Sequence, residues 1–180
     1  MENLFVGFEI IQPDRINDYN FPGVWAMFGI QKKNNPNNKY TCLNVGKSIC
    51  IGEELELDFK RLKCLKSITQ KIYKNQFNEE MFKYDDQPTR IDYLYNEISI
   101  KYNEIVTILI ACQAENTYII EKYFAYSTKA AYWVSNGRYS SNELLDNEKI
   151  TRIRNDIDIS AIDKSIIDKI DRFKSRYDEQ

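Results

Sequence analysis

Apolar positions divide the chain into short segments with strand-like or helix-like spacing, separated by polar connections. Runs rich in β-branched and aromatic residues predict strands, and apolar residues recurring every three or four positions predict helices. The predicted strands are 4–11, 24–30, 40–45 and 104–111. The predicted helices are 53–66, 114–124, 142–154 and 160–176. The near-continuous apolarity of 104–111 favours an interior position in a sheet.

The strands 24–30 and 40–45 are expected to pair as an antiparallel hairpin. Their connection is rich in Asn, contains a proline and has no apolar side chain, which is typical of a hairpin loop. Strand 104–111 is expected in the same sheet. The order of strands and helices therefore predicts an α+β fold, a small, largely antiparallel sheet flanked by helices. We place the main domain at 1–141 and a C-terminal helical extension packed on it at 142–180.

The predicted helix 53–66 has one apolar face. Leu55, Phe59 and Leu62 share that face, so we expect them to be buried against the sheet. We expect the polar positions between them to be more exposed: Glu54, Asp58 and Arg61.

The composition of the chain limits the kinds of catalysis and binding that it could support. The net charge of the 180 residues is −2, so DNA could be bound only through a local basic patch. No apolar run is long enough to span a bilayer, and the N-terminus lacks the features of a secretion signal, so we expect a cytoplasmic protein without membrane contact. The chain has no histidine, which excludes Ser-His-Asp and Cys-His catalysis and most zinc sites. The four cysteines show no C-x-x-C spacing and are expected to be reduced.

The most informative motifs are two glycine-ended strands. They are Gly23-Val24-Trp25 and Asn44-Val45-Gly46. Such a strand pair followed by an amphipathic helix resembles the core of the GIY-YIG nuclease family. The resemblance implies a GIY-YIG-like fold and, if activity is retained, DNA cleavage with one Mg²⁺ ion bound by a glutamate.

Two residues match functional positions of that family. Glu115 follows the apolar strand and opens the next helix, so the resemblance implies that it binds Mg²⁺. A glutamate in a first helical turn is also stabilised by the helix dipole without any metal. Lys47 follows Gly46 at a position that is often basic in the family. There it could bind phosphate or lower the pKa of an attacking group, or simply face solvent.

Other positions depart from the family. Trp25 replaces the first motif tyrosine, and an indole has no acid–base function near neutral pH. Asn44 replaces the second motif tyrosine and cannot take up a proton. Glu54 lies where the family has an arginine that stabilises the transition state.

Nearby residues could substitute for the missing groups. Arg61 lies further along the same helix and could bind phosphate, with Lys60 beside it. Tyr40 could assist a water nucleophile from the second strand.

Three interpretations follow. The first is a divergent Mg²⁺-dependent endonuclease with impaired or lost catalysis. Its catalytic residues would be Glu115, Lys47, Arg61 and Tyr40, and its substrate-binding residues Trp25, Asn44, Gly46 and Lys60. The second is a non-catalytic binding or inhibitory module on the same fold, which would contact a protein partner, or DNA through a local patch of its own surface. The third is an unrelated small α+β interaction protein.

Overall fold

The structure is a computed structural model that describes residues 4–33, 36–63, 90–135, 138–139 and 158–180. The strands are β1 (Glu9–Ile10), β2 (Gly23–Gln31), β3 (Tyr40–Ser48), β4 (Tyr102–Ala111), β5 (Val134–Ser135) and β6 (Arg138–Tyr139). The α-helices are 51–63, α2 (Arg90–Lys101), α3 (Thr117–Thr128) and α5 (Lys164–Glu179). Short 3-10 turns are η1 (Pro13–Asp18), η2 (Ala114–Asn116) and η4 (Ile159–Ala161). No helix in these ranges is long and apolar enough to cross a membrane.

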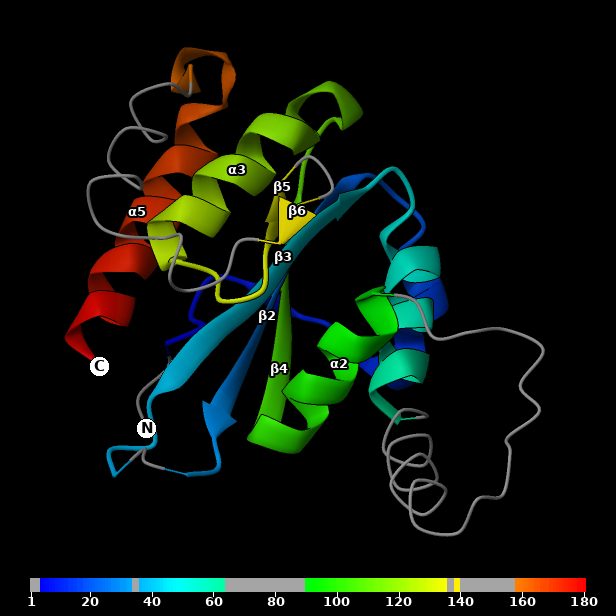
Figure 1. Ribbon diagram of the computed structural model, residues 1–180. Helices are drawn as coiled ribbons and strands as arrows, with labels where there is room; N and C mark the ends of the chain where they lie inside the picture. Colours follow the sequence, from blue (N-terminus) through cyan, green and yellow to red (C-terminus); the bar gives the residue numbers. More distant parts are fainter. Residues whose placement is uncertain (1–3, 34–35, 64–89, 136–137, 140–157) are drawn as a thin grey trace, which may run out of the picture.

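The α+β fold is confirmed. β1, β4, β2 and β3 form one antiparallel sheet in that spatial order. The predicted hairpin is present, and β4 lies inside the sheet as expected. Figure 1 shows α3 and α5 on one face of the sheet, and α2 with the helix over 51–63 on the other.

Both faces of β2 are covered, because its side chains alternate between two cores. Val24, Ala26 and Phe28 pack in the core beneath α3 and α5. Trp25 and Met27 pack in the core beneath α2 and the helix over 51–63. A strand buried on both faces reads as a continuous apolar run, and the sequence of β2 has that form.

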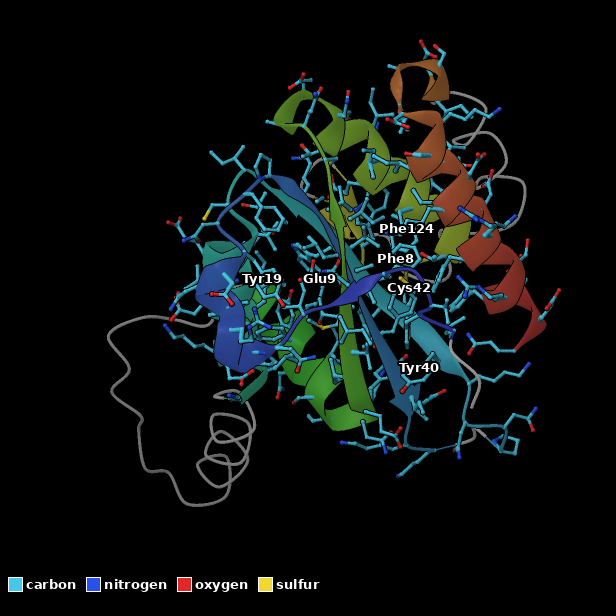
Figure 2. All side chains as sticks on the ribbon, turned by 180° about the vertical axis from the view of Figure 1, so that it is seen from behind. Phe8, Glu9, Tyr19, Tyr40, Cys42 and Phe124 are labelled. Carbon is cyan, nitrogen blue, oxygen red and sulfur yellow. The ribbon has the colours of Figure 1, made fainter. Side chains whose placement is uncertain are left out.

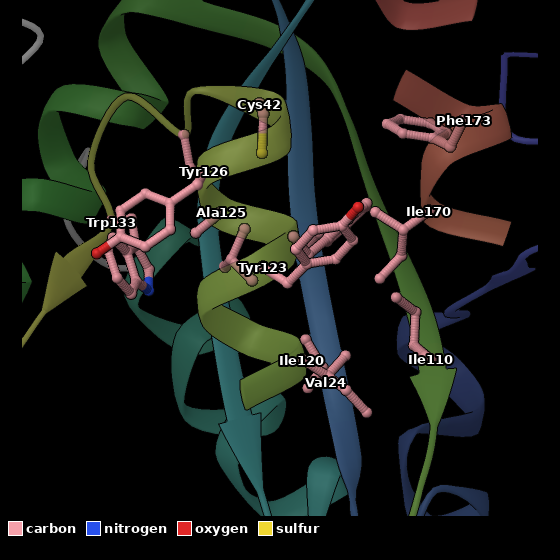
Figure 3. Close-up of a cluster of buried hydrophobic side chains, with 14 of the residues drawn as sticks. Val24, Cys42, Ile110, Ile120, Tyr123, Ala125, Tyr126, Trp133, Ile170 and Phe173 are labelled. Atoms are coloured by element: carbon pink, nitrogen blue, oxygen red, sulfur yellow. The ribbon is translucent and has the colours of Figure 1, made fainter. Parts of the chain in front are cut away.

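The C-terminal helix shares the first of these cores. Ile170 and Phe173 of α5 are fully buried there together with residues of β2 and α3 (Figure 3). The boundary that we placed between 141 and 142, and the predicted helix 142–154, lie outside the described residues.

The first predicted strand is mostly absent, which corrects our expectation for 4–11. Only Glu9 and Ile10 pair with β4, and Gly7 has φ +86°, a conformation that breaks an extended strand. The residues before it turn across the sheet instead. Figure 2 shows Phe8 close to Phe124 of α3, and the two ring centroids are 6.1 Å apart.

Candidate functional site

Trp25 and Gly46 are cross-strand neighbours at the centre of the two glycine-ended motifs. The indole lies directly against Gly46, because a Cβ atom at that position would lie 2.4 Å from Trp25 Cζ2. Trp25 is only 2% exposed. Glycine is therefore required at position 46 for the indole to pack there, and the ring fills the space beside the second motif.

Glu54, in the first turn of the helix over 51–63, is half-buried above this pair. Burial is the main cause that raises the pKa of Glu54 to about 7, and the nearby Asp58 carboxylate adds to it. Ser48 and the Trp25 indole lie close enough to the Glu54 carboxyl to oppose this rise in pKa. Even so, Trp25 Nε1 is buried and makes no hydrogen bond of good geometry with the described residues. A polar N–H and a partly neutralised carboxyl thus face one another.

Asp58 corrects our expectation for this helix. It is 4% exposed, although Leu55 on the same helix is buried as predicted and Phe59 and Leu62 pack partly against the core. The Asp58 carboxylate accepts a 2.8 Å hydrogen bond from Arg61 Nη1 and interacts with the Tyr95 hydroxyl of α2. Hydrogen bonds from these two donors offset the free-energy cost of burying the Asp58 carboxylate.

Arg61 links two carboxylates. Its guanidinium contacts Asp58 at 2.8 Å and Asp92 of α2 at 3.3 Å. Lys60, beside it, forms a 2.7 Å ion pair with Glu56 on the exposed side of the helix. Arg61 and Lys60, which we had considered for phosphate binding, therefore both have acidic partners.

Asn44 contributes to the same polar cluster from β3. Its Oδ1 accepts a 3.0 Å hydrogen bond from the backbone N–H of Val45, and its side chain also interacts with the Tyr95 hydroxyl. We use the name Glu54 cluster for Trp25, Asn44, Ser48, Glu54, Asp58 and Tyr95. Its members come from β2, β3, the helix over 51–63 and α2.

Lys47 lies on the opposite face of the sheet, since it pairs with Val24 rather than Trp25. Its Nζ is 5.8 Å from the centroid of the Tyr118 ring in α3, and it interacts with the Glu121 carboxylate. Glu115 is exposed in η2, just before the same helix. Lys47 and Glu115 are thus found near α3, whereas Arg61 lies beneath the other face.

Tyr40 is at the other end of β3, about 23 Å along the strand from Lys47 at ~3.3 Å per residue. Its ring contacts Phe5 at a centroid distance of 5.1 Å. It lines a groove of about 740 Å³ between the N-terminal segment, the β2–β3 connection and the last turn of α5. The structure does not bring Tyr40 to the other proposed catalytic residues.

Two residues near these sites were missed by the sequence analysis. Glu121 accepts a 3.2 Å hydrogen bond from Trp133 Nε1, and burial raises its pKa against the opposing effects of Trp133 and two lysines. Tyr95 closes the Glu54 cluster from α2. Neither residue belongs to a motif, and only the packing of α2 and α3 on the sheet gives them partners.

A metal site would rest on a single carboxylate. Within the ranges described above, no three Asp, Glu, His or Cys side chains gather as metal ligands. Glu115 would contribute one exposed oxygen donor group to Mg²⁺, and the present residues define no further coordination.

Comparisons with protein-family models, with curated proteins and with solved structures found no match to this chain.

Proposed function

We propose that this protein is a non-catalytic binding module for a protein partner, built on a fold that resembles the GIY-YIG core. The observation that carries this proposal is the packing of Trp25 on Gly46. In a nuclease of that family, a tyrosine hydroxyl would occupy the position of this buried indole. An indole neither accepts nor releases a proton near neutral pH.

The electrostatics of the Glu54 cluster favour the same conclusion. A phosphodiester would approach Glu54 and Asp58, two carboxyl groups that repel it whenever they are ionised. Arg61, the cation that contacts Asp58, already bridges Asp58 and Asp92. Among the residues that the structure describes on this face of the sheet, no further cation is seen to compensate the charge of a phosphoryl transition state.

A plasmid-nicking assay tests this proposal. The purified chain is incubated with supercoiled DNA and either Mg²⁺ or Mn²⁺, next to Glu115→Ala and to Glu53→Ala as a control for charge loss on an exposed surface. We expect no nicking by any of the three proteins. Robust nicking that Glu115→Ala abolishes and Glu53→Ala preserves would overturn the proposal and establish an enzyme.

One observation favours a second candidate function, DNA contact through a local patch. Tyr118 is 45% exposed, and Lys122 and Lys47 lie 4.6 and 5.8 Å from its ring centroid. An exposed aromatic ring beside cations is the usual element of single-strand binding. With two lysines involved, the logarithm of affinity should fall with the logarithm of salt at a slope of about −1.4. Fluorescence anisotropy with labelled single-stranded DNA measures this slope, and Lys47→Gln should halve it.

A further inference from the structure

Among the residues that the structure describes, none gives Glu54, the glutamate of the Glu54 cluster, a positive partner. Within the described part of the chain, the charged side chains that act on Glu54 are Asp58 and Glu121, and both are acidic. No lysine or arginine in the described ranges forms an ion pair with it. A half-buried carboxyl without a cation is costly in its charged form.

A second, independent sign of an unfilled site is the Trp25 indole N–H. This donor is buried, faces the Glu54 carboxyl and has no hydrogen-bond partner of good geometry in the part of the chain described. Buried N–H groups in folded proteins nearly always have a partner. A fully ionised Glu54 would be a strong acceptor for it, because hydrogen bonds to charged groups are the stronger ones.

We infer that the Glu54 cluster is the receptor for an arginine side chain of a protein partner. The inference rests on the proposed binding function and names the chemistry of the partner. A guanidinium placed on the solvent side of Glu54 would neutralise its carboxylate and leave the inner oxygen for the Trp25 N–H. Arginine suits the site better than lysine because its planar group matches a carboxylate with two parallel hydrogen bonds.

Arg61 provides an example of this recognition on the same helix. Its guanidinium joins Asp58 to Asp92, and Asp58 lies one turn after Glu54. An incoming arginine would pair with Glu54 in the same way as Arg61 pairs with Asp58. Binding would also release a proton, since a nearby cation lowers the raised pKa of Glu54.

The test uses Nα-acetylarginine amide as the probe and the uncharged isostere Nα-acetylcitrulline amide as its control. Both are titrated into the ¹⁵N-labelled full chain at pH 8 while the indole N–H resonances are followed. Trp133 is an internal reference, because its N–H already binds Glu121. We expect the arginine probe alone to move the Trp25 resonance saturably and to leave Trp133 in place.

Two variants complete the experiment. Glu54→Gln should abolish the shift of the Trp25 resonance, and Glu53→Gln, which removes an exposed charge from the same turn, should preserve it. The inference is overturned by an unmoved Trp25 resonance, by an equal response to citrulline, or by a response that survives Glu54→Gln. These results leave the nicking assay untouched, so failure of the receptor and failure of the non-catalytic proposal are distinguishable.

Discussion

Replacing Glu54 with glutamine should stabilise the protein at alkaline pH. The pKa of the folded Glu54 is about 7, against 4.5 for the free side chain. A carboxyl whose pKa is raised by folding favours the folded state fully below the unfolded value. It loses that contribution as the pH rises through the folded value. The difference corresponds to about 3 kcal/mol at ~1.4 kcal/mol per pH unit.

Water reaches the half-buried side chain and weakens this effect, so we expect Glu54→Gln to raise the free energy of unfolding by about 1–2 kcal/mol at pH 8. The gain should shrink to about a quarter of that value at pH 5, where Glu54 is protonated in the folded chain. Urea unfolding of both proteins between pH 5 and pH 8.5 measures this dependence.

Glu53→Gln is the matched control. Glu53 lies in the same first turn of the helix but is exposed, so its replacement removes the same charge and the same favourable interaction with the helix dipole. We expect it to be neutral or slightly destabilising at every pH. The reasoning is refuted if Glu54→Gln gives no gain at pH 8, if the gain is independent of pH, or if Glu53→Gln gives the same gain.

Two further substitutions probe packing on the same face of the sheet. Gly46→Ala places a Cβ atom 2.4 Å from the Trp25 ring, so it should lower stability by about 1–3 kcal/mol and shift the tryptophan fluorescence; an unchanged melting temperature would contradict the close contact. Phe59→Ala should cost about 1–3 kcal/mol, because the ring packs partly against the core. The control Leu57→Ala, at a 53% exposed position, should cost less, and equal losses would show that the buried face was assigned wrongly.

The sheet could be predicted from sequence because its strands carry local signals. The apolar runs of β2, β3 and β4 and the polar loop between the first two define their pairing without reference to the rest of the chain. The prediction of an N-terminal strand over 4–11 was wrong, for a reason that is also local. The left-handed φ of Gly7 interrupts it, and Phe5 and Phe8 pack on the C-terminal helix instead.

The polar cluster was less predictable. Helical periodicity assigned Asp58 to the exposed side, and its burial depends on Tyr95 and Arg61, which reach it from α2 and from the next turn. Lys47 and Arg61 lie on opposite faces of the sheet. The alternation of side chains along β3 was sufficient to predict the face of Lys47. Lys47 directly follows Gly46 in the motif, but adjacent residues of a strand point to opposite faces of the sheet, so the two do not share a face.

The outer edge of β3 has a consequence for the growing chain on the ribosome. In the folded protein, the Gln180 amide pairs with both backbone groups of Tyr40, and the Tyr177 hydroxyl accepts from the N–H of Cys42. Gln180 lies 140 residues after Tyr40, so at ~5–20 residues per second the backbone groups of Tyr40 at this edge stay without their partner for about 7–28 seconds. During translation, the uncharged stretch from Tyr40 to Gly46 is an open template for other strands. Slow codons in the second half of the message would lengthen that interval, and the yield of soluble protein should fall with them.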